Sequence, residues 1–413
     1  MKLSEIRDIA ASQKGRLEGT DIGLEREALA GLPDIETHAL IVSGVRRCGK
    51  STLLHQFTRR LDRPFFYLNF DDLRLSPFSV VDYALVDTII EEVAPRVLFF
   101  DEIQSAPDWE LYIRQKLDER YQVLITGSNS SLLSRELGTK LTGRHISKEL
   151  FPFSYGEFLA FKGLTRGLGS LESYLDSGGF PEYLKTGNLE IVSQLQSDIL
   201  YRDIAVRYGI RDASSLIRLY SFLVSNAAHL VSPSKLVQVA GVKSPSTVLE
   251  YFSRFETSYL LQLVPRFDWS VKAQSLSPKK LYVSDSAFIR SGSVSFSPDR
   301  GALLENFVFC EARRRTTDIF YFSDGTRECD FVVNPHGGSP VCVQVCMALN
   351  TENEGREIEG LEAALAFFGI SSGYIITADS VDTILRNGRT IRLLPAHSFD
   401  FSQFKTGSFT CAN

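Results

Sequence analysis

Residues 41–54 read IVSGVRRCGKSTLL and indicate the architecture of the N-terminal half of the chain. This stretch contains the pattern G-x-x-x-x-G-K-S between Gly44 and Ser51, after an apolar run typical of a buried strand and before a run typical of a helix. In this context the glycines let backbone N–H groups turn toward a phosphate, and the start of the helix favours negative charge. The stretch therefore predicts a phosphate-binding loop on an α/β fold.

This loop predicts the contacts of a nucleoside triphosphate. Lys50 is expected to reach the β- and γ-phosphates, and the Ser51 hydroxyl is expected to bind Mg²⁺. Arg46 and Arg47 inside the loop are candidates for contacts with the nucleotide or with a partner. ATP is the expected ligand. Other nucleotides stay open, because the loop contacts phosphates and not the base. The predicted nucleotide-binding residues are Gly44, Val45, Arg46, Arg47, Cys48, Gly49, Lys50, Ser51 and Thr52.

An acidic pair, Asp101-Glu102, follows the continuous apolar run VLFF at residues 97–100. Such a run is typical of a strand buried in a parallel sheet, and it delivers its last residue to the edge where the phosphate loop also lies. Asp101 is then expected to hold Mg²⁺, directly or through water, and Glu102 to orient and polarise an attacking water. A surface turn is the alternative. The position on the second strand after the loop favours a catalytic pair and predicts ATP hydrolysis.

Two further features concern the γ-phosphate. An apolar strand predicted at residues 122–128 ends in Ser128-Asn129, whose polar side chains can touch the γ-phosphate or the attacking water. An ordinary Gly-Ser-Asn turn is the alternative. Arg144, in LTGRH, is a candidate arginine finger that acts on a neighbouring subunit's nucleotide or within its own subunit. A solvated arginine on a strand edge explains it equally well.

Length and composition limit the number of domains and the classes of partner. The 413 residues suggest two to four domains, and the net charge of −5 gives no overall attraction to nucleic acid or to an anionic membrane. The six cysteines form no tight framework, which favours a reduced cytoplasmic protein. The first residues lack the apolar segment of a signal peptide, and the longest apolar run, near residues 363–370, is too short to span a bilayer. We therefore expect a cytoplasmic protein without a membrane partner.

Changes of pattern along the chain predict five segments. The phosphate loop and the acidic pair fall in the second, which follows a helical segment inferred from Leu24, Ala28 and Leu32 at helical spacing. A sharp turn at residues 178–182 and several helical runs suggest a lid after the core. The segments are an N-terminal helical part (1–37), the ATPase core (38–152), a helical lid (153–211), a winged-helix-like part (212–275) and an α/β part (280–404).

The fourth segment predicts three helices in the order of a helix-turn-helix, followed by a wing at residues 261–268. Glu250 and Glu256 on the third helix weaken a phosphate-binding face. Because winged helices also dock on proteins, double-stranded DNA and a protein partner both stay open. The residues that can face a DNA backbone are Lys235, Lys243, Ser244, Ser246 and Thr247.

The last segment carries acids in the pattern of a restriction-endonuclease-like fold. Glu305 lies on a predicted helix, and Asp330 and Gln344 lie on predicted strands, where that fold holds Mg²⁺. The position two residues after Gln344 needs a Lys, but Cys346 occupies it, and a thiol has no positive charge at pH 7. We therefore expect a degenerate domain, with an active nuclease as the weaker alternative. The cysteines of this segment are better interpreted as core residues than as a zinc site.

The joint order of these motifs resembles one family. The chain is similar to the bacterial and archaeal predicted AAA-type P-loop ATPases that carry a C-terminal domain of unknown function. The resemblance implies an additional-strand ATPase core with a parallel sheet between helices, then a winged helix and a restriction-endonuclease-like end. The segments that carry it are GVRRCGKSTLL, FFYLNFDDLRL, VLFFDEIQ, VLITGSNSSLLS, LTGRH followed by LFPFSYGEFL, GGFPEYL, DILYRDI and ECDFVV.

The resemblance also implies roles for residues and for the whole chain. It places ATP binding on residues 44–52 and the Walker B role on Asp101 and Glu102, and it makes Arg144 a better arginine-finger candidate. We expect a Mg²⁺-dependent ATPase that couples its nucleotide state to a winged-helix and C-terminal module binding DNA or a protein. The alternatives are a slow nucleotide-gated switch with a protein partner and, less favoured, an ATP-dependent DNA nuclease. An oligomeric arrangement stays open.

Overall fold

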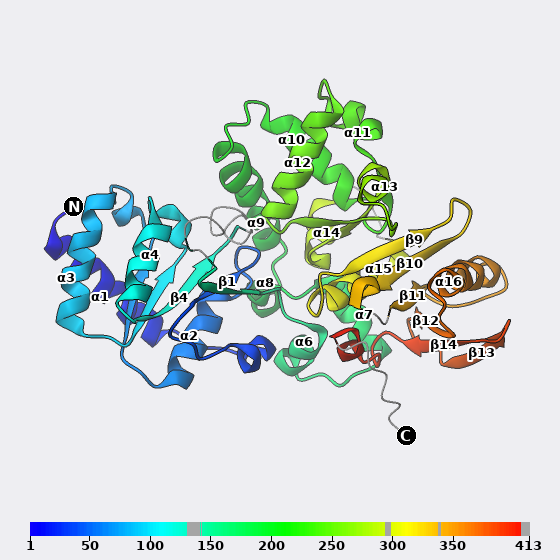
Figure 1. The fold of residues 1–413 in the computed structure, drawn as a ribbon, viewed down its shortest axis with the longest axis horizontal. Coiled ribbons are helices and arrows are strands. Elements are labelled where there is room, and N and C mark those ends of the chain that lie inside the picture. The colour runs from blue at the N-terminus through cyan, green and yellow to red at the C-terminus, as the bar shows by residue number, and fades with distance from the viewer. Residues whose placement is uncertain (130–140, 142, 294–298, 338–339, 406–413) are drawn as a thin grey trace. The chain divides into compact units, whose positions relative to one another are not determined.

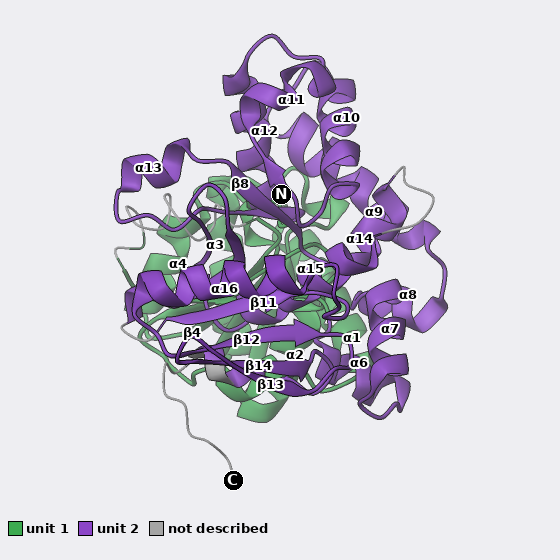
Figure 2. Cartoon of the chain, turned by 90° about the vertical axis from the view of Figure 1, so that its right-hand side faces the viewer, with its two compact units in different colours: residues 1–152, 257–259 green, residues 153–256, 260–413 purple. Residues whose placement is uncertain are grey.

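The chain forms two compact units, which Figure 2 shows in different colours. The first consists of residues 1–152 with 257–259, and the second of residues 153–256 with 260–413. The finer predicted divisions within the second unit stay predictions. The computed structural model describes residues 1–129, 141, 143–293, 299–337 and 340–405.

The first unit is built on the parallel strands β1 (Ala39–Ser43), β2 (Phe65–Asn69), β3 (Val97–Asp101), β4 (Gln122–Gly127) and β5 (His145–Glu149). They form a five-stranded sheet in the order β2-β3-β4-β1-β5. Every residue of β1, β3 and β4 is buried, as expected for strands covered on both faces. Because β4 lies between β1 and β3, this is the additional-strand arrangement, and the predicted fold class is confirmed.

The helices that flank this sheet are α1 (Leu3–Gly19), α2 (Lys50–Leu61), α3 (Tyr83–Val93) and α4 (Trp109–Asp118). Side chains of α1, α3 and α4 share one apolar cluster with the sheet. α2 packs on β1, β3 and β4 (Figure 1). Short 3-10 helices lie at Leu73–Leu75, Val80–Asp82 and Ile103–Ser105. All five strands therefore end at one edge, between the helix layers.

The prediction of a helix around Leu24, Ala28 and Leu32 is wrong about its position. The helix of this N-terminal part is α1, and only a short 3-10 helix, Glu27–Gly31, forms near the predicted position. Leu32 has extended backbone angles (φ −81°, ψ 127°), the conformation that a following proline favours, and Pro33 comes next. The proline thus explains why the helical spacing is not realised.

The second unit begins with the helices α6 (Tyr155–Lys162), α7 (Leu168–Ser177), α8 (Pro181–Thr186) and α9 (Glu190–Asp198). α9 continues into a π-helix, Ile199–Val206, so the long helix predicted from residue 191 is present with a changed hydrogen-bond pattern. In the sharp turn before α8, a Cβ on Gly179 would lie 2.2 Å from the Phe153 carbonyl oxygen. Glycine is therefore required at this close approach.

A three-helix part follows, made of α10 (Ala213–Val224), α11 (Pro233–Ala240) and α12 (Pro245–Thr257). Beside it lie the strands β6 (Leu230–Val231), β7 (Leu261–Val264) and β8 (Lys279–Val283), which form an antiparallel sheet in the order β6-β8-β7. Helix α13 (Val271–Leu276) falls between β7 and β8 in the chain. β7 ends at Val264, so the strand of the predicted wing is shorter than residues 261–268.

The C-terminal strands are β9 (Ile319–Ser323), β10 (Glu328–Val333), β11 (Val341–Val345), β12 (Ser372–Thr377), β13 (Asp382–Arg386) and β14 (Arg389–Pro395). They form a mixed sheet in the order β13-β14-β12-β11-β10-β9. The helices beside it are α15 (Arg300–Arg313) and α16 (Glu354–Phe368), whereas α14 (Ser286–Gly292) packs on α7, α9 and α10. Short 3-10 helices lie at Pro335–Gly337 and Phe401–Lys405. α16 packs on β10, β11 and β12, which gives the predicted α/β part a continuous core.

The cysteines of this part are core residues. Cys329, Cys342 and Cys346 belong to an apolar cluster with α16, and Cys310 is also buried. Their burial accounts for them without a metal ion. In the described part of the chain, each helix is too short or too polar to cross a membrane.

Candidate nucleotide-binding site

The phosphate loop joins the end of β1 to the start of α2. Gly44 has φ 151° and Gly49 has φ 100°, and a Cβ on Gly44 would lie 2.0 Å from the Leu150 carbonyl oxygen. A side chain at Gly44 would therefore force the backbone to move. The loop curls over the N-terminus of α2, where backbone N–H groups and the helix dipole favour a phosphate.

Lys50 is the first residue of α2 and is only 4% exposed. Its ammonium donates to the carbonyl oxygens of Gly44 and Val45, both at 3.1 Å, so it lies across the inside of the loop. The Glu102 carboxylate is 3.7 Å away. The ammonium is thus held between the loop and the acidic pair, a position suited to neutralising phosphate charge.

Asp101 is the last residue of β3 and is buried. Its carboxylate accepts hydrogen bonds from Ser51 Oγ at 2.9 Å, from Tyr67 OH at 2.8 Å and from Thr126 Oγ1. Burial, together with the neighbouring Glu102, raises the pKa of Asp101. The Ser51 hydroxyl and the Asp101 carboxylate are the oxygen ligands that Mg²⁺ prefers, so this pair fits the expected ion.

Glu102 follows Asp101 with left-handed backbone angles (φ 49°), a strained conformation that is common at functional sites. Its carboxylate faces Lys50 and accepts hydrogen bonds from Gln104 Nε2 and from the Ser128 N–H at 3.2 Å. Burial raises the pKa of Glu102, but the Lys50 ammonium and these hydrogen bonds outweigh burial, and the net effect lowers the pKa. Glu102 is therefore ionised at neutral pH and already engaged by protein groups.

Two family models match the chain: an AAA domain over residues 36–159 and a domain of unknown function (DUF8612) over residues 168–293. An uncharacterised protein of Methanocaldococcus jannaschii is 33% identical over 350 residues, which is 79% of this chain and 78% of the relative. An uncharacterised protein of Haemophilus influenzae is 30% identical over 315 residues, 71% of this chain and 78% of the relative. The chain belongs to this family of AAA-domain proteins.

Two solved structures resemble this AAA-domain protein at low sequence identity. The RuvB Holliday junction branch migration motor of Thermotoga maritima is 19% identical, with a TM-score of 0.31, over 63% of this chain and 89% of that one. The ORC1 protein of Aeropyrum pernix, in complex with DNA, is 11% identical, with a TM-score of 0.30, over 74% of this chain and 91% of that one. At these TM-scores neither likeness says what this AAA-domain protein binds.

The predicted sensor residues follow β4 at the same edge of the sheet. Besides the bond from its N–H to Glu102, Ser128 has its hydroxyl 3.5 Å from Gln104 Nε2. Asn129 is 3% exposed. The structure thus brings Ser128 to the acidic pair, and contact of Ser128 or Asn129 with a γ-phosphate stays a prediction.

The other loop residues of the AAA domain differ in exposure. Arg46 pairs with Asp71, just after β2, with 2.8 Å between Nη2 and Oδ2, and Arg47 is exposed. Val45 and Cys48 are buried. Burial raises the pKa of the Cys48 thiol, which therefore stays neutral. Contact of Arg46 or Arg47 with a ligand or partner stays a prediction.

Arg144 lies at the opposite edge of the sheet from the phosphate loop. It directly precedes β5, its carbonyl oxygen accepts the Ala39 N–H at the start of β1, and its guanidinium pairs with Asp118 at the end of α4. β1 is five residues long, so its two ends lie about 15 Å apart. A role on the nucleotide of its own subunit does not fit this position, whereas a role on a neighbouring subunit stays a prediction.

Arg26 touches the loop but could not be singled out from the sequence. It is 4% exposed, and its guanidinium donates to the carbonyl oxygens of Cys48 at 2.7 Å and Phe151 at 2.8 Å. Gln56 on α2 accepts the Arg26 N–H at 3.2 Å. An isolated arginine in an irregular segment carries no motif. Tyr67 and Thr126, which hold Asp101, were missed because a strand hydroxyl looks like any other core polar group.

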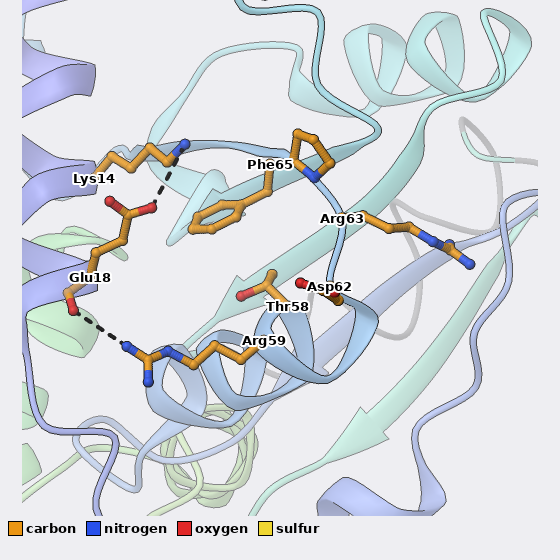
Figure 3. Close-up of a pocket in the computed structure, with 8 residues that line it drawn as sticks. Lys14, Glu18, Thr58, Arg59, Asp62, Arg63 and Phe65 are labelled. Atoms are coloured by element: carbon orange, nitrogen blue, oxygen red, sulfur yellow. Dashed lines mark hydrogen bonds and ion pairs between the residues drawn. The ribbon is translucent and has the colours of Figure 1, made fainter.

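A second hollow of about 640 Å³ lies at the far end of α2, away from the phosphate loop (Figure 3). The Lys14 ammonium lies 3.8 Å from the Glu18 carboxylate, and Arg59 donates to the Glu18 carbonyl oxygen at 3.5 Å. Lys14 thus pairs with Glu18 and Arg63 pairs with Asp34, and the lining carries charges of both signs, which gives no preference for one class of ligand. The hollow is lined by Lys14, Glu18, Thr58, Arg59, Asp62, Arg63, Pro64 and Phe65.

The acids predicted for a nuclease-like site meet in the second unit. Gln344 Oε1 accepts the Asp330 N–H at 3.1 Å, and the Lys280 ammonium lies between Asp330 and Glu305. Cys346 follows β11, and burial raises its pKa to about 12, so it is a neutral thiol. The predicted constellation is thus assembled, with a lysine inside it that the sequence pattern did not indicate.

Proposed function

We propose that this AAA-domain protein binds ATP together with Mg²⁺ and hydrolyses it. The observation that carries the proposal is the meeting of Lys50, Ser51, Asp101 and Glu102 at one edge of a parallel sheet. Ser51 Oγ donates to Asp101 at 2.9 Å, and the Lys50 ammonium lies 3.7 Å from Glu102. A cation, a hydroxyl and two carboxylates in this arrangement suit transfer of a phosphoryl group to water.

Each of these side chains has a separate task in the proposal. Lys50 neutralises charge on the β- and γ-phosphate oxygens, and Ser51 and Asp101 hold Mg²⁺. The ion, when bound, supplies further positive charge to the phosphate oxygens. The hydroxyls of Tyr67 and Thr126 fix the Asp101 carboxylate from behind, as outer partners of a metal ligand commonly do. Glu102 accepts a hydrogen bond from the attacking water and orients it.

The contacts of Glu102 support a second candidate, a nucleotide-gated switch with slow turnover. The carboxylate faces Lys50 and accepts hydrogen bonds from Gln104 and Ser128. Both hydrogen bonds end on Oε2 and fix the orientation of the carboxylate, so turning it toward an attacking water would release part of this set. A partner that binds better to the released state would raise turnover, because it shifts the population toward that state. The second candidate therefore predicts a low basal rate.

We further propose that the three-helix part is a winged helix that receives a partner. The chain order α10, β6, α11, α12, β7, β8 and the β6-β8-β7 sheet support this. The exposed side of α12 carries Leu249, which is 55% exposed, and Glu250, which pairs with Arg254. The Arg254 guanidinium in turn lies 3.7 Å from the centre of the Tyr208 ring. Such a face suits a protein partner better than a DNA backbone.

Steady-state ATP turnover with Mg²⁺ tests the proposal, with Lys50→Ala as the blank. Turnover above the blank supports hydrolysis, and ATP binding without turnover leaves only the switch. A several-fold rise in turnover with double-stranded DNA would refute the preference for a protein partner. Failure of the wild type to bind ATP would refute both candidates.

A further inference from the structure

The C-terminal part holds a buried ammonium inside its acid cluster. Lys280, on β8, is 3% exposed, although lysine is among the residues least often buried. Its Nζ lies 2.6 Å from Asp330 Oδ1, 2.9 Å from Glu328 Oε1 and 3.0 Å from Glu305 Oε1. β8 and α15, which carry Lys280 and Glu305, are labelled in Figure 2. One internal cation thus contacts three carboxylates from α15 and β10.

Further hydrogen bonds hold the carboxylates of Asp330 and Glu305 in place. Asp330 Oδ2 accepts the Val345 N–H at 2.8 Å, so both Asp330 oxygens have partners. Glu305 Oε1 also accepts the Tyr282 hydroxyl at 2.6 Å. Gln344, the third predicted metal ligand, directs its Oε1 to the Asp330 N–H.

Gln344 is also held from its other end. Its Nε2 donates to Glu357 Oε2 at 2.6 Å, and Glu357 is 1% exposed. The amide is therefore fixed in the orientation that aims its oxygen at the backbone of β10. A metal ion that used this oxygen would have to share it with the Asp330 N–H.

These contacts do not fit a bound divalent cation. Mg²⁺ lies about 2.0–2.1 Å from its oxygen ligands. An ion at that distance from Glu305 Oε1 and Asp330 Oδ1 would take the place of the Lys280 ammonium, which already lies within hydrogen-bond distance of both atoms. The two cations would also repel each other in a buried site of low effective dielectric. Lys280 and a divalent ion therefore exclude each other.

We propose that Lys280 takes the place of the divalent cation in the acid cluster of the C-terminal sheet, so that this sheet works as a binding and structural module and not as a metal-dependent nuclease. The role of Lys280 is to neutralise the three acids and to join β8 to β10 and α15. Loss of the ammonium leaves carboxylates that attract a divalent cation.

Manganese binding tests the proposal directly, measured calorimetrically on the full chain without nucleotide. We expect the wild type and Asp330→Asn to bind Mn²⁺ equally, because the acid cluster of the wild type holds no Mn²⁺. Lys280→Ala should gain one Mn²⁺ site, bound at least tenfold more tightly than any in the wild type, and the double variant with Asp330→Asn should lose it. Lys279→Ala, at the neighbouring half-buried position, is the matched control and should behave as the wild type. Any Mn²⁺ held at the phosphate loop is common to all five proteins and cancels.

Two outcomes would overturn the proposal. One is a Mn²⁺ site in the wild type that Asp330→Asn abolishes, because a metal would then displace or join the ammonium. The other is a folded Lys280→Ala protein that gains no Mn²⁺. Melting curves decide whether that variant is folded, and Mn²⁺ should raise its melting temperature but not that of Lys280→Ala with Glu305→Gln and Asp330→Asn.

Plasmid nicking gives a test that needs no substitution at Lys280. We expect the wild type and Asp330→Asn to nick supercoiled DNA to the same background extent with Mg²⁺ or Mn²⁺. Nicking by the wild type that falls to background in Asp330→Asn would overturn the proposal, whatever the Lys280 variants do. ATP turnover is unaffected by either outcome, so this test is separate from that of the AAA domain.

Discussion

Replacement of Arg26 by alanine should weaken ATP binding, although no sequence motif contains this residue. The guanidinium donates to the Cys48 and Phe151 carbonyl oxygens, and a Cβ on Gly49 would lie 3.1 Å from Arg26 Nη1. It therefore lies directly against the phosphate loop. Truncation removes both hydrogen bonds and leaves a cavity beside the loop.

The size of the effect follows from these two bonds. A hydrogen bond to a charged group contributes about 1.5–3 kcal/mol, so the Arg26 pair contributes roughly 3–6 kcal/mol to the local structure. The loop can relax, and if about half of this is lost from ATP binding, the affinity falls roughly 10- to 100-fold. Fluorescence titration with a labelled ATP analogue and Mg²⁺ measures the change.

Arg59→Ala is the matched control, because Arg59 is an exposed arginine on α2 whose guanidinium donates to the Glu18 carbonyl oxygen at 3.5 Å. It should bind ATP within about twofold of the wild type. An Arg26→Ala protein that melts earlier but binds ATP with unchanged affinity would refute the reasoning, since Arg26 would then stabilise only the fold. Equal weakening by Arg59→Ala would point to lost charge near α2 and not to loop contacts.

Three further predictions concern other residues. Lys50→Ala should bind ATP more weakly and lose turnover, because it removes the ammonium that lies across the loop. Calorimetry should show a larger loss of affinity for ATP than for ADP. Equal losses of affinity would contradict the assigned phosphate contact. Arg144→Ala should lower turnover with an almost unchanged melting curve, since its half-exposed pair with Asp118 contributes about 0–1 kcal/mol; unchanged turnover at all protein concentrations would exclude a finger in trans. Burial raises the pKa of Asp285 from 3.8 to about 6, so the folded protein favours the protonated carboxyl. The stability that this shift contributes is complete below pH 3.8, and up to about 3 kcal/mol of it is lost as pH rises through about 6. The melting temperature of Asp285→Asn minus that of the wild type should therefore rise between about pH 4 and pH 7, and a constant difference would contradict it.

The phosphate loop and the acidic pair could be predicted because local sequence decides their geometry. The spacing of Gly44 and Gly49 encodes a backbone that other residues cannot adopt, and the structure has φ 151° and 100° there. Asp101 ends a run of buried residues, so its place at the carboxyl edge follows from strand direction alone. Lys50, Ser51 and Asp101 are therefore found together where the sequence placed them.

Arg26 and Lys280 could not be predicted, because their partners are distant in the chain. Arg26 reaches a carbonyl 125 residues away, at Phe151, and Lys280 reaches a carboxylate 50 residues away, at Asp330. Neither side chain stands in a local pattern, and a lysine is expected to be exposed until the fold buries it. Their positions depend on how separate elements pack, which no periodicity records.

Two other elements, helix α1 and the hairpin of β13 and β14, have clear local signals in the sequence. α1 buries Ile6, Ile9, Ala10 and Gln13, whose spacing is that of one helix face. The hairpin of β13 and β14 turns at Asn387-Gly388, where both residues have positive φ, and this dipeptide is a strong hairpin signal. Both elements could therefore have been predicted from the sequence.

The claim that the edge of the parallel sheet is an ATPase site is tested most directly by the Glu102→Gln variant. Its ATP turnover and its ATP affinity are both measured. General-base residues commonly contribute 10²- to 10⁴-fold, so we predict ATP affinity within about threefold of the wild type and turnover lowered at least about 100-fold. Gln104→Ala, which removes a group that holds Glu102, is the matched control and should hydrolyse ATP at least as fast as the wild type. Unchanged turnover in Glu102→Gln would contradict the role assigned to this carboxylate.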